Sequence, residues 1–345
     1  MKHSVKCLLV TAALGLSGMY TNAAPVSDLS AGQTGRIEFE SITPAGIWQY
    51  VRRNMDGTKQ VVVYGDLLMP KSVSGKVPAM ILSHGSGGVS PFAYEVWARQ
   101  LNAAGVAVFI IDTFKPRGFS ETNTTVNPVG PMAQVADALN GLRILATHPQ
   151  IDSSRIYNIG FSRGGSTAFY TAWPMFQRPV DTNGIKFAGH IPVYPGMCDM
   201  RYRADVNVKA TAPVFMALPD RELEDWQNGA NCVRFSQELA AAGQPVTFKE
   251  YKGTHHGWDG RAKFFYLNNA FVSAKCDMEV QLTDVPGGGL GRDGKDFKTG
   301  KTLLTYDDWN TAAKACLSNV RARVEGNEKQ SDALVKDVLN FMGVR

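Results

Sequence analysis

The chain has 345 residues, of which 44% are hydrophobic and 19% are charged. This composition provides material for a sizeable core and excludes wholesale disorder. The net charge of +5 comes without a long basic run, so a nucleic-acid partner is not expected.

The first residues have the pattern of a secretory signal peptide. A basic start is followed by an apolar stretch from Cys7 to about Met19 and by small residues at Ala23 and Ala24. The apolar stretch is too short to span a membrane. We therefore predict a signal peptide at residues 1–24 and a secreted or periplasmic mature protein without stable membrane insertion.

Beyond the leader, short apolar runs alternate with segments of helical spacing. Strands are predicted at residues 60–70, 77–85, 106–112, 153–160, 185–196, 212–218 and 245–253, and helices at residues 91–105, 130–149, 165–173, 231–243 and 330–342. This alternation predicts an α/β fold with a mostly parallel sheet that is covered by helices on both faces. We expect one domain over residues 25–345, with an excursion at about 260–328 before the C-terminal helix.

The stretch "IGFSRGG" places Ser162 between a predicted strand and a predicted helix. This order indicates a nucleophile elbow, in which Gly160 and Gly164 permit a sharp turn and the serine Oγ projects above the sheet. The N–H of Arg163, at the start of the helix, can then face a developing oxyanion. The loop "HGSGG" after an earlier strand offers the N–H of Ser86 as the second oxyanion donor.

A general base and a carboxylate are expected after later strands. His255 and His256 follow the last predicted strand, where the base lies in hydrolases that have the order serine, acid, histidine. The acid, which orients the imidazole, should follow the strand at residues 212–218. The carboxylates there are Asp220, Glu222, Glu224 and Asp225. Spacing alone does not choose among them.

Five segments between Val77 and Asp259 carry a resemblance to a known family. They are "ILSHGSGG", "VWARQLNAAGVAVFIIDTFKPRG", "DALNGLRILATHPQIDSSRIYNIGFSRGG", "EDWQNGANC" and "YKGTHHGWDG". In this order they make the chain resemble the dienelactone hydrolase family, which implies the α/β-hydrolase fold.

The resemblance also implies roles for individual residues. Ser162 takes the place of the nucleophile, where the founding members of the family have cysteine. His256 takes the place of the base, because a small residue and then an aromatic residue follow it. Dienelactone itself is therefore not the expected substrate.

For the acid, the resemblance indicates Glu224. Related secreted members have a cysteine eight residues after the catalytic aspartate, and Cys232 stands at that distance from Glu224. However, glutamate replaces the usual aspartate, and about two extra residues separate it from the strand. Asp220 and Asp225 therefore remain alternatives.

Secretion and an even number of cysteines predict disulfides once the leader, with Cys7, is removed. We expect the pairs Cys198–Cys232 and Cys276–Cys316. The first pair should lie at one edge of the sheet, after two adjacent strands. The second pair belongs to the excursion, which has few apolar runs to hold it.

Together these features predict a secreted serine hydrolase that cleaves a small carboxylic ester or lactone through an acyl-enzyme, without a metal or cofactor. An acyltransferase, an amide-cleaving hydrolase and a non-catalytic binding protein of the same fold are the alternatives. Arg117 and Trp258 are candidate substrate contacts. The competing interpretation of Arg117 is a salt bridge that holds its loop.

Overall fold

The computed structural model describes residues 24–72, 74–124, 129–204, 207–222, 226–282 and 294–344. The predicted signal peptide lies outside these residues, apart from Ala24. None of the helices in the described part of the chain has the length and apolar character that crossing a membrane requires.

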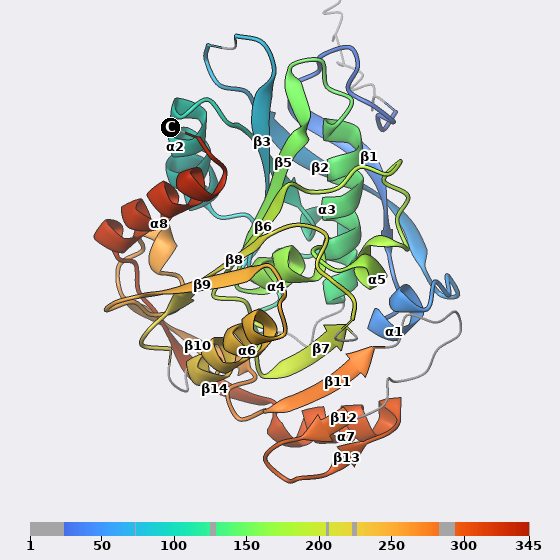
Figure 1. Ribbon diagram of the computed structural model, residues 1–345, viewed down its shortest axis with the longest axis vertical. Coiled ribbons are helices and arrows are strands. Elements are labelled where there is room, and N and C mark those ends of the chain that lie inside the picture. The colour runs from blue at the N-terminus through green and yellow to red at the C-terminus, as the bar shows by residue number, and fades with distance from the viewer. Residues whose placement is uncertain are drawn as a thin grey trace, which may run out of the picture.

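The centre of the molecule is an eight-stranded sheet with the order β1-β2-β4-β3-β5-β6-β8-β9 (Figure 1). β2 pairs antiparallel with both of its neighbours, and the other pairs are parallel. The strands are β1 (Gly35–Thr43), β2 (Lys59–Leu68), β3 (Val77–Ser83), β4 (Ala107–Asp112), β5 (Ile151–Phe161), β6 (Gly189–Val193), β8 (Val214–Pro219) and β9 (Val246–Tyr251). This arrangement is the α/β-hydrolase fold, as the resemblance implied.

Helices cover both faces of this sheet. α3 and α6 pack on one face, whereas α2 and α8 lie side by side on the other (Figure 1). Every residue of β3 and β4 is consequently buried, which explains why these strands are apolar runs without alternation. The helical segments are α1 (Ile47–Val51), η1 (Ala93–Ala98), α2 (Arg99–Ala103), η2 (Lys115–Arg117), α3 (Pro131–Leu145), α4 (Arg163–Tyr170), α5 (Pro174–Gln177), α6 (Gly229–Ala241), η3 (Trp258–Gly260), α7 (Tyr306–Cys316) and α8 (Glu328–Phe341).

The predicted excursion folds into two small sheets and a helix. β10 (Phe265–Val272) pairs antiparallel with β14 (Ser318–Val324), and we call this pair the β10–β14 arm. β11, β12 and β13 form a second sheet that is completed by β7, from the segment between β6 and β8. These strands are β7 (Met200–Ala204), β11 (Met278–Leu282), β12 (Gly294–Asp296) and β13 (Thr302–Leu303). The parallel pairing of β7 with β11 attaches the excursion to the main body.

Both predicted disulfides are present, as Cys198–Cys232 and Cys276–Cys316. The first joins the segment after β6 to α6, at one edge of the sheet. The second joins the segment after β10 to the end of α7, so it closes the excursion on itself. The excursion is thus held by a disulfide and by strand pairing, together with a small cluster around Ala270, Val272 and Ala322 and with apolar side chains of β11 and α7 that join the main core.

Candidate active site

Ser162 occupies a strained turn between β5 and α4. Its backbone has φ 54° and ψ −114°, a sparsely populated conformation for a residue with a side chain. The turn is fixed by the Ser162 N–H, which donates to Val193 O at 3.0 Å, and by its carbonyl, which accepts from Ser166 N at 3.1 Å. The serine thus lies at a sharp strand-to-helix turn, the geometry that the sequence predicted for this position.

Close backbone contacts explain the glycines on either side of the serine. A Cβ at Gly160 would lie 1.8 Å from Gly164 O, and a Cβ at Gly164 would lie 2.0 Å from Ser83 O. Any side chain at these positions would push α4 away from the ends of β3 and β5. The glycines therefore allow the helix start to approach the sheet closely enough to raise Ser162 above it.

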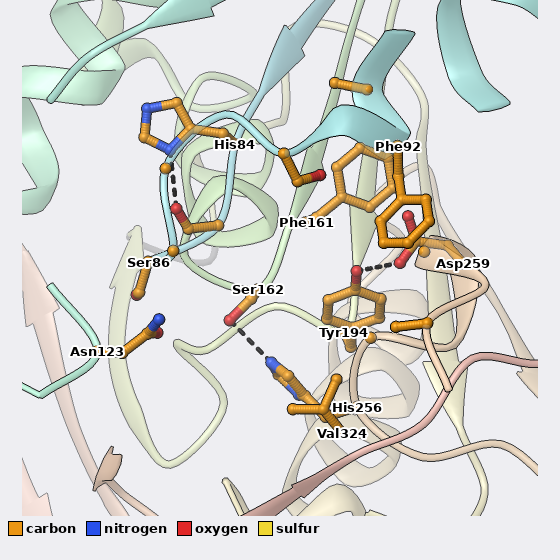
Figure 2. Close-up of a pocket in the computed structure, with 18 of the residues that line it drawn as sticks. His84, Ser86, Phe92, Asn123, Phe161, Ser162, Tyr194, His256, Asp259 and Val324 are labelled. Carbon is orange, nitrogen blue, oxygen red and sulfur yellow. Dashed lines mark hydrogen bonds between the residues drawn. The ribbon is translucent and has the colours of Figure 1, made fainter. Parts of the chain in front are cut away.

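His256 contacts the serine hydroxyl, as shown by a dashed line in Figure 2: its Nε2 is 2.9 Å from Ser162 Oγ. The histidine lies in the loop after β9 and is largely buried. The neighbouring His255 lies instead 4.0 Å from a carboxylate oxygen of Glu325. The structure thus brings only the second histidine of the pair to the serine.

The other imidazole nitrogen, Nδ1 of His256, is in contact with Glu222 Oε1. The Glu222 side chain is fully buried, and its second oxygen accepts a 3.2 Å hydrogen bond from Gln227 Nε2. With the contact to Ser162 at Nε2, the imidazole bridges a hydroxyl and a buried carboxylate. This is the arrangement of a serine hydrolase triad.

The carboxylate at His256 is therefore not the Glu224 that the sequence indicated. Glu224 and its alternative Asp225 lie outside the described residues. Asp220, the other alternative, accepts hydrogen bonds from the backbone N–H groups of Gly253 and Thr254 at 2.8 and 3.1 Å. Asp220 thus ties the loop that carries Glu222 to the loop that carries His256.

Two aromatic rings hold the imidazole in place. Trp226 stacks on His256 with ring centroids 4.9 Å apart, and Tyr194 packs against it at 4.6 Å. The Trp226 indole N–H donates to Arg323 O in β14 at 2.7 Å. The excursion therefore supports the His256 ring through this tryptophan, a contact that the sequence did not predict.

The predicted oxyanion donors lie beside the serine, since Ser86 and Arg163 line the same cavity as Ser162. The Ser86 loop is anchored by His84, which is buried. His84 Nε2 accepts from Thr113 N at 3.1 Å, so its Nδ1 carries the proton and donates to Gly85 O at 2.7 Å. Burial lowers the pKa of His84, which favours this neutral tautomer.

Neither Arg117 nor Trp258, the two candidate substrate contacts, lines the cavities beside Ser162, and Arg117 makes the salt bridge of its competing interpretation. The Arg117 guanidinium is buried and makes a bidentate ion pair with Asp137, with both N···O distances 2.8 Å. Its remaining N–H groups donate to Thr43 Oγ1 and to two backbone carbonyls. Trp258 is fully buried and packs on Tyr194. Arg117 therefore holds its own loop against α3, and Trp258 supports the Tyr194 ring.

A cavity of about 290 Å³ opens beside the serine and the histidine (Figure 2). Figure 2 shows Ser86 and Asn123 on one side of Ser162, with aromatic rings on the other. Asp259 also borders this cavity, and burial raises the pKa of its carboxyl. Its oxygens accept from Tyr194 OH and from Trp97 Nε1, so protein donors satisfy them.

Comparison with known proteins adds a family match. The Dienelactone hydrolase family matches residues 63–278. No curated protein matches the sequence.

Solved structures of similar fold include Thermogutta terrifontis esterase 2 phosphorylated by paraoxon, with 17% identity and a TM-score of 0.46, over 57% of this chain and 80% of that chain. The butyrate-bound form of the same esterase has 15% identity and a TM-score of 0.45, over 57% of this chain and 81% of that chain. A candidate dienelactone hydrolase from Klebsiella pneumoniae subsp. pneumoniae has 17% identity and a TM-score of 0.46, over 65% of this chain and 89% of that chain.

Proposed function

The chain belongs to the dienelactone hydrolase family, and we propose that it is a secreted serine hydrolase that cleaves a carboxylic ester or lactone. The observation that carries the proposal is the continuous contact from Ser162 through His256 to Glu222. A serine hydroxyl is a weak nucleophile unless a positioned base removes its proton. Here the proposed base, His256, contacts the serine hydroxyl through Nε2 and the proposed orienting carboxylate of Glu222 through Nδ1.

In the proposed mechanism, His256 Nε2 takes the proton of Ser162 as Oγ attacks the ester carbonyl. Glu222 holds the Nδ1 proton and stabilises the imidazolium that forms. The N–H groups of Ser86 and Arg163 donate to the oxyanion of the tetrahedral intermediate. His256 then protonates the leaving alcohol. In the second half-reaction His256 takes a proton from water, which attacks the acyl carbonyl, and then returns that proton to Ser162 Oγ as the acid is released.

Secretion is supported by two observations. The first 24 residues have the sequence pattern of a signal peptide, and both disulfides join cysteines beyond it. Disulfides persist in oxidising compartments and are rare in the cytosol. Isolation of the protein from the secreted or periplasmic fraction, with a mature N-terminus near Pro25, is the expected result.

The proposed chemistry is tested with matched substrates. Purified protein should release p-nitrophenol from p-nitrophenyl esters with multiple turnovers, and it should cleave the corresponding p-nitroanilides far more slowly. Product analysis with an added alcohol should show mainly the free acid. Faster anilide cleavage, dominant acyl transfer to the alcohol, or binding of esters without turnover would each point to another function.

His84 gives a further prediction about the oxyanion site. Gly85 C=O and Ser86 N–H belong to one planar peptide group and point in opposite directions, so the His84 bond to Gly85 O aims the Ser86 N–H. Loss of an oxyanion donor costs roughly 10²–10³ in kcat. We expect His84→Phe to lower kcat by roughly 10- to 100-fold with little change in KM, because aim is weakened rather than the donor removed.

His84→Gln is the matched variant, since its amide can donate to the same carbonyl. It should recover part of the lost kcat. Thermal unfolding of both variants distinguishes a misdirected Ser86 N–H from a loss of core packing around residue 84. If the two lose equal kcat in proportion to their loss of stability, His84 acts only as a core residue.

A further inference from the structure

We propose that the substrate is an ester with a bulky apolar group on each side of the scissile bond, and that the β10–β14 arm limits the size of both groups. This inference rests on the proposed function, because it assigns substrate groups to the two cavities that meet at Ser162. It names a substrate class and the residues that select it.

Two cavities, of about 290 and 310 Å³, meet at the nucleophile. The residues that line both are Ser86, Asn123, Ser162, Trp226 and His256. The volume of each cavity is close to the lower end of the range for small-molecule sites. An ester bound at Ser162 therefore has room to extend its acyl group into one cavity and its alcohol group into the other.

The walls of the two cavities differ in kind. The first, which we call the aromatic cavity, is lined by Phe92, Trp97, Phe161, Tyr194 and Phe265. The second, which we call the tyrosine–methionine cavity, has an apolar wall of Tyr170, Met197, Met200, Tyr202 and Leu317, and its polar lining residues are Thr122, Arg163, Ser166, Gln227 and Ser273. Since protein donors already satisfy the Asp259 carboxyl, the aromatic cavity favours an apolar group rather than a cation.

The β10–β14 arm contributes to both cavities, and its strand β10 contains a bulge. The register shifts between Leu267 and Ala270, so one extra residue reverses the alternation of side chains along the strand. Leu267 therefore shares the inner face of the arm with Val272, although the two are an odd number of residues apart. Leu267 lines the aromatic cavity and Val272 lines the tyrosine–methionine cavity.

The second strand continues the same pattern. Val324 is paired with Phe265 and lines the aromatic cavity. Figure 2 shows its side chain with that of His256 among the residues of this cavity. Leu317, immediately before β14, lines the other cavity. Both residues lie beyond residue 278, where the family match ends. The part of the wall that β14 and Leu317 supply thus lies outside the family match, whereas β10 lies within it.

The test uses two series of unactivated esters, one with growing acyl chains on methanol and one with growing alcohol chains on acetate. Burial of a methylene corresponds to about a fourfold gain in kcat/KM. The wild-type protein should gain by about this factor per carbon in both series until each cavity is full. A flat response in either series would overturn the two-sided assignment.

Two filling variants then assign the cavities. Val324→Phe should abolish the gain in one series and Leu317→Phe the gain in the other. Arg321→Ala is the matched control on the same strand, because its guanidinium stacks 3.9 Å from the ring centroid of Tyr266, away from both cavities. If both filling variants flatten the same series, the inference is wrong.

Covalent labelling of Ser162 by a small fluorophosphonate distinguishes failure of this inference from failure of the proposed function. Labelling without any chain-length dependence would contradict only the substrate class. Absence of labelling in the wild-type protein would contradict the serine mechanism itself. Should either filling variant lose labelling through misfolding, Leu267→Phe replaces Val324→Phe, and Val272→Phe replaces Leu317→Phe.

Discussion

Replacement of Ser162 by alanine is expected to lower kcat for ester hydrolysis by roughly 10⁴–10⁶-fold. The variant keeps the cavity and the proposed oxyanion donors but has no Oγ to attack the carbonyl. His256 Nε2, now 2.9 Å from the position of the lost hydroxyl, would have no nucleophile to activate. Steady-state turnover of a p-nitrophenyl ester by the purified variant measures the effect.

The two adjacent histidines provide the control for this result. His256→Ala should approach the loss of Ser162→Ala, because members of a triad act as a unit. His255→Ala should lose less than about tenfold, since the His255 ring faces Glu325 rather than the serine. Wild-type turnover in Ser162→Ala, or a larger loss for His255→Ala than for His256→Ala, contradicts the proposed mechanism.

The second large effect concerns the acid. Glu222→Gln keeps the size of the side chain but removes the charge that faces Nδ1 of His256. If the new amide oxygen keeps the hydrogen bond from Gln227, its NH2 group donates to Nδ1, so the imidazole is held in the wrong tautomer and its protonated state loses its charged partner. We expect kcat to fall by roughly 10⁴-fold with little change in KM, as for other triads that lose this carboxylate.

Three companion substitutions make this experiment decisive. Glu224→Gln and Asp225→Asn should each cost less than about tenfold, although the sequence alone favoured Glu224. Asp220→Asn should lower the unfolding temperature and leave kcat within about tenfold of wild type, because Asp220 ties the loop of Glu222 to the backbone of Gly253 and Thr254. A crippling Glu224→Gln beside a nearly active Glu222→Gln would restore the original assignment.

The sheet and the elbow were predictable because their signals are local. Each buried strand is a short apolar run bounded by turns, and its neighbours are helices of ordinary spacing. Ser162 could be recognised from a strand, a glycine-flanked serine and a helix in direct succession. The contact of His256 with that serine agrees with the position after the last strand of the sheet.

The acid was harder to place because two measures of distance disagreed. The distance to Cys232 indicated Glu224, although about two extra residues separated it from the preceding strand, and Asp220 and Asp225 stayed open. The carboxylate in contact with His256 is Glu222, three residues after the end of β8. The strand end is the better guide here, since the loop must reach His256 directly from the sheet.

The walls of the site could not be predicted from local pattern. The β10–β14 arm pairs strands that are about 50 residues apart, and a bulge reverses the alternation on which strand patterns depend. Arg117 was misplaced for a related reason. It follows a strand end near the site, but its guanidinium turns back to Asp137 on α3 and leaves no donor for a substrate.

The most direct test of the central claim is to identify the residue that a mechanism-based inhibitor modifies. The mature protein is incubated with a small fluorophosphonate, digested, and mapped by mass spectrometry, with His256→Ala treated in parallel. The proposed mechanism predicts a single phosphonyl adduct on Ser162, formed with loss of esterase activity and greatly slowed in His256→Ala. Inactivation with the adduct on another residue, or full esterase activity after complete modification of Ser162, would contradict it.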